Sequence, residues 1–182
     1  MHGPGSAAWL LVALCAATGA YCLLRMRSGV EEQRRTAGSE ALMGFGMALM
    51  AVPAAVITPP RAAWALYAVV FGAAALRALW ASRSSAHHLH HLVGTFAMAY
   101  MAVGMATAPR GHAGHGGAGA PLVTGLLLLY FAGYVLWSGV RLVPVATAGG
   151  GPPASGWGDR PELARACRLS MGIGMVAMLL TM

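Results

Sequence analysis

Residues 121–143 read PLVTGLLLLYFAGYVLWSGVRLV, an apolar run with one charged residue, Arg141. A helix needs about 20 mostly apolar residues to cross the hydrocarbon core of a bilayer, so this run predicts a transmembrane helix. Other stretches that meet the same criterion are 7–26, 40–57, 60–81, 88–107 and 162–182. The sequence therefore predicts an all-α bundle of six transmembrane helices, forming a single transmembrane domain over residues 1–182.

The composition is that of a membrane protein. Of the 182 residues, 58% are hydrophobic and 9% are charged, and the mean hydropathy is +0.64. These values lie outside the range of a soluble globular domain. The net charge of +7 comes from 12 arginines against 5 acidic residues. The arginines lie at the ends of apolar runs, where membrane topology explains them, so the predicted partner is the lipid bilayer and not a nucleic acid.

The distribution of arginines predicts the orientation in a bacterial plasma membrane. Ten arginines lie in or beside the loops after the first, third and fifth spans: Arg25, Arg27, Arg34, Arg35, Arg77, Arg83, Arg141, Arg160, Arg165 and Arg168. The opposite side has only Arg61 and Arg110. Cytoplasmic loops are enriched in basic residues, so both termini are predicted outside. The second, fourth and sixth helices then run parallel to one another.

These three helices also share a sequence pattern. Residues 40–50 read EALMGFGMALM, residues 168–178 read RLSMGIGMVAM, and residues 91–101 read HLVGTFAMAYM. The segments align without gaps, which predicts three repeated helical hairpins with a parallel, methionine-lined inner core of three helices.

The methionines of this pattern recur at spacings of four and three residues, which places them on one face of a helix. They are Met43, Met47, Met50, Met98, Met101, Met105, Met171, Met175, Met178 and Met182. If the three faces meet, the thioethers stack in rings, of which Met47, Met98 and Met175 form one. Thioethers are soft ligands that select Cu(I) over hard cations. The pattern therefore favours a copper(I)-binding membrane protein that transports or buffers copper.

Two other functions stay open. Methionine also fills gaps in cores, so the protein could be a metal-free structural or accessory membrane protein. A haem-b protein with His and Met as axial ligands is a third interpretation. The sequence has no nucleophile–base arrangement, phosphate loop or carboxylate pair, so an enzyme is not expected.

Further candidate metal ligands lie toward the ends of the spans or, for His112 and His115, in the glycine-rich outer loop: Glu40, His87, His88, His90, His91, Cys167, His112 and His115. His87 and His91 are i,i+4 neighbours and could chelate one ion. Glu40 has an alternative interpretation as a residue favoured by the positive end of a helix that Ser39 caps. Arg168, on the same predicted face, is interpreted as a side chain that extends to the membrane interface.

Two resemblances accompany these patterns. The whole chain resembles small multi-span membrane proteins of actinobacteria that are grouped as a domain of unknown function, which implies no activity. The pairs Met43/Met47 and Met171/Met175 resemble the MxxxM motif of the eukaryotic high-affinity copper transporters. In that family three subunits contribute thioether triads around one pore, which three repeats in one chain could imitate. Gly94 departs from the motif in the fourth span.

Overall fold

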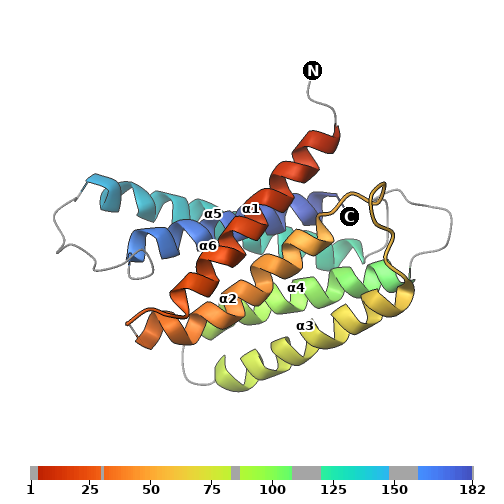
Figure 1. Cartoon of the computed structure of the whole chain (residues 1–182), viewed down its shortest axis with the longest axis horizontal. Coiled ribbons are helices and arrows are strands. Elements are labelled where there is room, and N and C mark those ends of the chain that lie inside the picture. The colour runs from red at the N-terminus through yellow and green to blue at the C-terminus, as the bar shows by residue number, and fades with distance from the viewer. Residues whose placement is uncertain (1–3, 30, 83–86, 108–119, 148–159, 182) are drawn as a thin grey trace. The chain divides into compact units, whose positions relative to one another are not determined.

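The computed structural model describes residues 4–29, 31–82, 87–107, 120–147 and 160–181, and its regular elements are helices (Figure 1). They are α1 (Pro4–Arg25), α2 (Glu31–Met50), α3 (Arg61–Ser82), α4 (His87–Thr107), α5 (Pro121–Thr147) and α6 (Pro161–Leu180). The predicted all-α class is confirmed. Proline occupies the first position of α1, α5 and α6, where its missing N–H costs no helical hydrogen bond.

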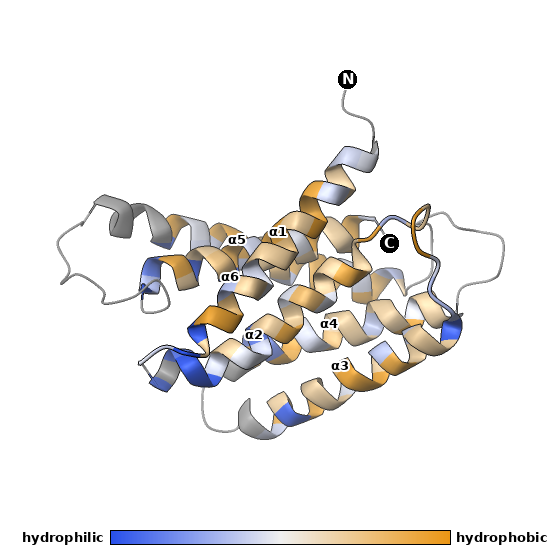
Figure 2. Cartoon of the chain, in the orientation of Figure 1, coloured by the Kyte–Doolittle hydropathy of each residue, from blue (hydrophilic) through white to orange (hydrophobic). Residues whose placement is uncertain are grey.

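Five of these helices are long and apolar enough to cross a membrane. The qualifying segments are Gly5–Arg25, Arg61–Trp80, Leu89–Thr107, Pro121–Arg141 and Pro161–Leu180. Apolar residues run along most of their length (Figure 2). The chain is therefore a multi-pass α-helical membrane protein.

The second helix differs from the predicted span 40–57. It begins at Glu31, inside the segment that was expected to be a loop, and it ends at Met50. Glu31 and Arg35 form an ion pair at the i,i+4 spacing, 2.5 Å apart, which supports the polar first turns. The helix ends ahead of Pro53, because proline lacks an N–H and disfavours helical geometry in the residue before it. The first half of α2 is polar, so α2 is not among the five apolar segments.

The fifth helix is also longer than predicted. It continues through Pro144 to Thr147, beyond the predicted end of the span at residue 143. Residues 148–159 lie outside the described part of the chain.

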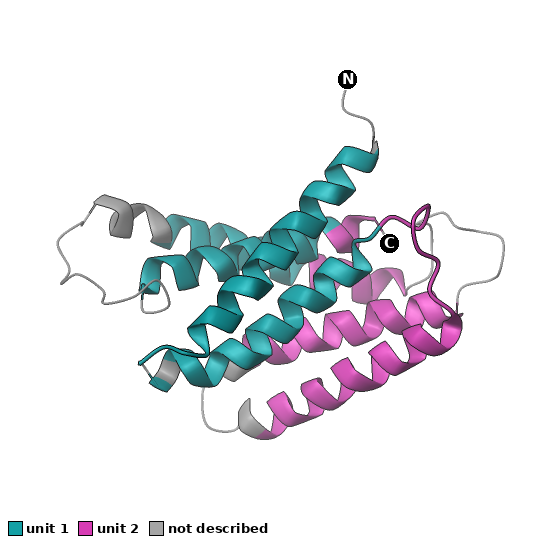
Figure 3. Ribbon diagram, viewed as in Figure 1, with its two compact units in different colours: residues 1–52, 129–177 teal, residues 53–128, 178–182 magenta. Residues whose placement is uncertain are grey.

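The chain divides into two compact units (Figure 3). Unit 1 comprises Met1–Val52 and Leu129–Ala177, and unit 2 comprises Pro53–Leu128 and Met178–Met182. Unit 1 contains the helical hairpin α1·α2 with most of α5 and α6. Unit 2 contains the hairpin α3·α4 with the start of α5 and the end of α6.

In unit 1, α1 and α2 approach each other closely at two glycines. A Cβ atom added to Gly44 would lie 2.8 Å from the Cα of Gly19 and 3.2 Å from the carbonyl oxygen of Cys15. A Cβ atom at Gly19 would lie 3.2 Å from the Phe45 ring. Small residues allow this kind of backbone contact between membrane helices. The close approach brings the polar residues nearer the turn of this hairpin together.

In unit 2, aromatic side chains follow one side of α3. Tyr67 stacks on the buried Phe71 with ring centroids 4.6 Å apart, and Trp64 meets Tyr67 edge-on at 6.2 Å. The hydroxyl group of Tyr100 on α4 donates to the carbonyl oxygen of Ala120 at 3.1 Å, just before α5. Unit 2 is thus built mainly by aromatic and apolar packing.

Candidate functional site

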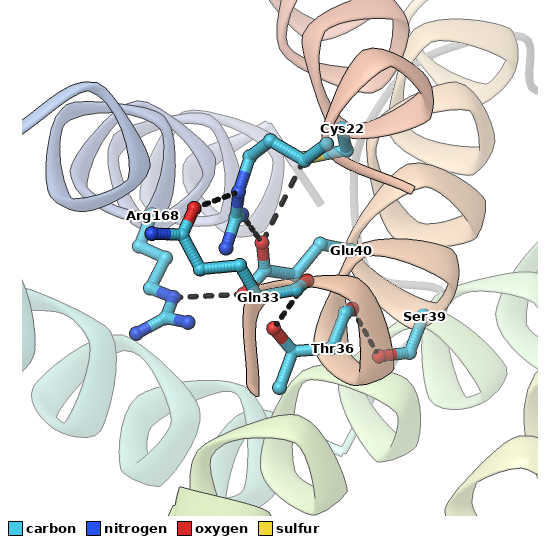
Figure 4. Close-up of polar contacts among 7 residues, drawn as sticks. Cys22, Gln33, Thr36, Ser39, Glu40 and Arg168 are labelled. Atoms are coloured by element: carbon cyan, nitrogen blue, oxygen red, sulfur yellow. Dashed lines mark hydrogen bonds and ion pairs between the residues drawn. The ribbon is translucent and has the colours of Figure 1, made fainter. Parts of the chain in front are cut away.

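The most polar buried feature of unit 1 is an ion-pair cluster of Arg25, Glu40 and Arg168, here called the Arg–Glu–Arg cluster. Oε2 of Glu40 accepts a hydrogen bond from Nη1 of Arg25, and Oε1 accepts from Nε of Arg168 at 2.7 Å (Figure 4). The side chains of Glu40 and Arg25 are 0% and 1% exposed, and that of Arg168 is 28% exposed. One carboxylate therefore joins α1, α2 and α6.

Further polar groups surround this carboxylate. The thiol of Cys22 lies 3.8 Å from Oε2 of Glu40, and Nε of Arg25 donates to Oε1 of Gln33 at 3.4 Å. The hydroxyl of Ser39 donates to the carbonyl oxygen of Thr36 at 2.9 Å (Figure 4). The hydrogen bonds of the Glu40 carboxylate and the Arg25 guanidinium group are charge-assisted. Such bonds are stronger than neutral ones and fix geometry.

Two interpretations of these residues from the sequence are wrong. Glu40 is not near the start of its helix, because α2 begins at Glu31, and Ser39 binds a carbonyl group within the helix instead of capping it. Arg168 does not simply extend to the interface, because its Nε is held by Glu40. In this arrangement Glu40 acts as the counter-ion of two arginines.

Sequence reasoning overlooked Arg25, which was counted only as a topological charge. The register of the hairpin α1·α2 contains a signal that predicts the neighbours of Arg25. In an antiparallel pair, residues equally distant from the turn face each other, and Gly19 meets Gly44 as Cys22 meets Glu40. Continuing that register toward the turn places Arg25 opposite the stretch of α2 between Gln33 and Glu40. Arg25 binds both of these side chains.

Buried thioethers follow the cluster on two helices of unit 1. Met43 and Met47 on α2, and Met171 and Met175 on α6, are all buried. Met43 comes three residues after Glu40, and Met171 comes three residues after Arg168, so each pair shares a helix face.

The contacts of Met47 define how α2 and α6 align. A Cβ atom at Gly174 would lie 2.6 Å from the Cε of Met47 and 3.5 Å from the Sγ of Cys15. The contacts of Glu40 with Arg168 and of Met47 with Gly174 advance in the same direction along both helices. α2 and α6 are therefore parallel, with the register of the sequence alignment to within one residue.

The other methionines of the predicted pattern differ in burial and in the unit to which they belong. Met98, Met101 and Met178 are buried, and Met50 and Met105 are half-buried. Met182 lies outside the described residues. Met98, Met101 and Met105 belong to unit 2, so the rings that combine them with α2 and α6 stay a prediction.

The described histidine and cysteine candidates do not form a group on one site as the buried methionines of α2 and α6 do. His90 and His91 are half-buried neighbours on α4 with ring centroids 6.3 Å apart, and Cys167 is a half-buried free thiol on α6. The side chains of His87 and His88, and residues His112 and His115, lie outside the described part of the chain. Among the side chains that are described, no group of three His, Cys, Asp or Glu residues converges to hold a metal ion.

Apolar helices around a buried ion-pair cluster define the class as a polytopic α-helical membrane protein. Residues 32–182 match the family described as Domain of unknown function (DUF5134), and the chain belongs to that family. The match includes Glu40 and Arg168 and begins after Arg25. The comparisons with curated proteins and with solved structures give no match. The expected membership in a domain of unknown function is confirmed, and it assigns no activity.

Proposed function

We propose that this protein binds Cu(I) within the membrane through buried methionine thioethers, and that it transports or buffers copper. The observation that supports this function is the burial of Met43, Met47, Met171 and Met175 on two parallel helices in one register. Soft, neutral thioethers suit Cu(I), and they add no ligand charge to a low-dielectric interior.

The finer architecture belongs to the same proposal. The apolar second half of α2 makes a sixth span, and three repeated hairpins place Met98 and Met101 of α4 beside the thioethers of α2 and α6. Both termini are outside, with the arginine-rich loops in the cytoplasm. The buried methionine faces of α2, α4 and α6 support this arrangement.

Reporter fusions test the orientation. A reporter inserted at Gly29 or Ser84 is expected to be cytoplasmic, and one after Met182 is expected to be external, because arginines concentrate on one side. A cytoplasmic signal after Met182 would give an odd number of spans and contradict the proposed topology.

Metal analysis of protein purified in detergent with ascorbate tests copper binding. The triple variant Met47→Leu, Met98→Leu and Met175→Leu keeps side-chain volume nearly constant, so each site should lose less than about 1.5 kcal/mol of stability. It removes every thioether of the central ring, and we expect a folded protein with less copper. Ag(I), a soft mimic, should compete with Cu(I) in the wild type.

Met26→Leu is the matched control, because Met26 is exposed and lies outside the methionine pattern. Equal copper content in the wild type and the triple variant would remove the ring from any functional account. A wild type without copper would favour the metal-free structural alternative, which the packing of the Met47 methyl group on Gly174 supports. A haem absorption band in the purified protein would favour the haem-b alternative instead.

A further inference from the structure

One end of unit 1 concentrates positive charge. The Arg–Glu–Arg cluster ties the end of α1 to the middle of α2 and to the first half of α6, so the charged residues before the cluster on α2 and α6 lie at the same end of the unit, coloured blue in Figure 2. The described arginines of these segments are Arg25, Arg27, Arg34, Arg35, Arg160, Arg165 and Arg168, and the described glutamate side chains are Glu31, Glu40 and Glu162. This set, called the arginine end, has an excess of positive charge.

Arg168 makes the largest contribution to this excess of positive charge near the buried ion pair. The buried pair of Arg25 and Glu40 is neutral by itself, so Arg168 gives the cluster a net positive charge, and it lies within the candidate span Pro161–Leu180. Charged side chains inside a span are costly unless they are paired. The hydrogen bond of Arg168 to Glu40 uses Nε, and the dashed line in Figure 4 ends at that nitrogen.

Arg165 adds a second charge to the same side of α6. It is exposed and lies three residues before Arg168, and residues at this spacing are neighbours on a helix. Like charges at this spacing repel each other, whereas an anion between them would turn repulsion into attraction. The positive end of the α6 dipole, which begins at Pro161, favours an anion in the same place.

We propose that Arg165 and Arg168 bind the phosphate group of an anionic phospholipid. The planar fork of arginine matches the oxygens of a phosphate group. A lipid is the occupant because the two arginines lie in the first turns of a spanning helix, at the level where headgroups meet the protein. Glu40 orients Arg168 by holding Nε, which leaves the two terminal nitrogens of a partly exposed guanidinium group for the phosphate oxygens. This site is independent of copper.

Native mass spectrometry of the detergent-purified full chain tests the site. The probes are phosphatidylglycerol, phosphatidylcholine and inorganic phosphate, each titrated separately. The wild type should retain phosphatidylglycerol in preference to phosphatidylcholine. Arg165→Gln leaves the ion pairs of Glu40 intact, and it should weaken phosphatidylglycerol binding about fivefold, as expected for removing one arginine near a headgroup. Arg168→Lys keeps the charge but loses the fork, and it should also weaken binding.

Arg141→Gln is the matched control, because Arg141 is an exposed arginine on α5 whose guanidinium group lies over the Trp137 ring, 4.4 Å from its centroid. Its phosphatidylglycerol affinity should equal that of the wild type. An unchanged affinity in Arg165→Gln would overturn the proposal, as would an equal loss in Arg141→Gln, which would indicate general surface charge. Inorganic phosphate that binds as tightly as the lipid would also overturn it, because the site would then be one for a soluble anion.

Discussion

The hairpins α1·α2 and α3·α4 have the same plan and are held together differently. In α1·α2 the backbones meet at Gly19 and Gly44, and a buried ion pair joins Arg25 to Glu40. In α3·α4 the buried Phe71 stacks on Tyr67, and a Cβ atom added to the nearby Gly72 would have no neighbour within 4 Å. The first hairpin thus has a glycine contact and an ion pair between its helices, whereas the ring stack of the second hairpin lies along α3 itself.

The comparison shows that the buried ion pairs of the described residues belong to the first hairpin and to α6. Lipid tails are as apolar as helix surfaces, so membrane helices associate through close packing and hydrogen bonds. The first hairpin uses both and extends its ion pair to Arg168 of α6. A buried ion pair is weak evidence for added stability, and in some proteins such a pair fixes which arrangement its helices adopt. We therefore regard the Arg–Glu–Arg cluster as the feature that sets the register of α6 against the hairpin α1·α2.

The largest predicted effect comes from removing the shared carboxylate. Glu40→Leu leaves Arg25 buried without its counter-ion, and breaking one side of a buried pair costs about 3–5 kcal/mol. We expect a large fall in the midpoint of thermal unfolding in detergent, measured by circular dichroism.

Glu31→Gln is the control for this variant, because it removes the exposed pair with Arg35 on the same helix. Exposed i,i+4 pairs contribute about 0.3–0.5 kcal/mol, so this variant should unfold almost as the wild type does. If Glu40→Leu were no less stable than Glu31→Gln, the cluster would not hold the three helices together.

The helices were predictable from the sequence because apolar length is a direct requirement of the bilayer. The limits of α2 were not. Residues 31–39 read EEQRRTAGS, which hydropathy assigns to a loop, but a helix outside the hydrocarbon core needs only suitable backbone propensity and pairs such as Glu31 with Arg35. The end at Met50 follows from Pro53, a signal that was present and was outweighed by the apolar residues 51–57.

The candidate site was predicted only in part. Glu40 and Arg168 were recognised as equivalent positions of two aligned segments, and the register that makes them partners follows from that alignment. Arg25 was missed because counting arginines for topology treats each one as a solvated charge, whereas pairing depends on the register of a hairpin. That register is set by the Gly19/Gly44 contact, which the sequence contains but hydropathy does not measure.

The smallest predicted effect is the difference in stability between two glycine-to-alanine variants, one in each hairpin. In Gly44→Ala the new Cβ atom would lie 2.8 Å from the Cα and 2.9 Å from the backbone nitrogen of Gly19, so α1 and α2 must move apart. Overpacking of this kind costs about 1–3 kcal/mol, which exceeds the gain of about 1 kcal/mol from replacing glycine within a helix.

In Gly72→Ala the new methyl group enters open space, so only the helical gain of roughly 0.5–1 kcal/mol is expected. The two variants carry the same chemical change on two helices of one chain, and they should shift the unfolding midpoint in opposite directions. The same detergent unfolding measurement checks both. If Gly44→Ala were as stable as Gly72→Ala, the close contact of α1 with α2 would not set the position of Arg25 against Glu40.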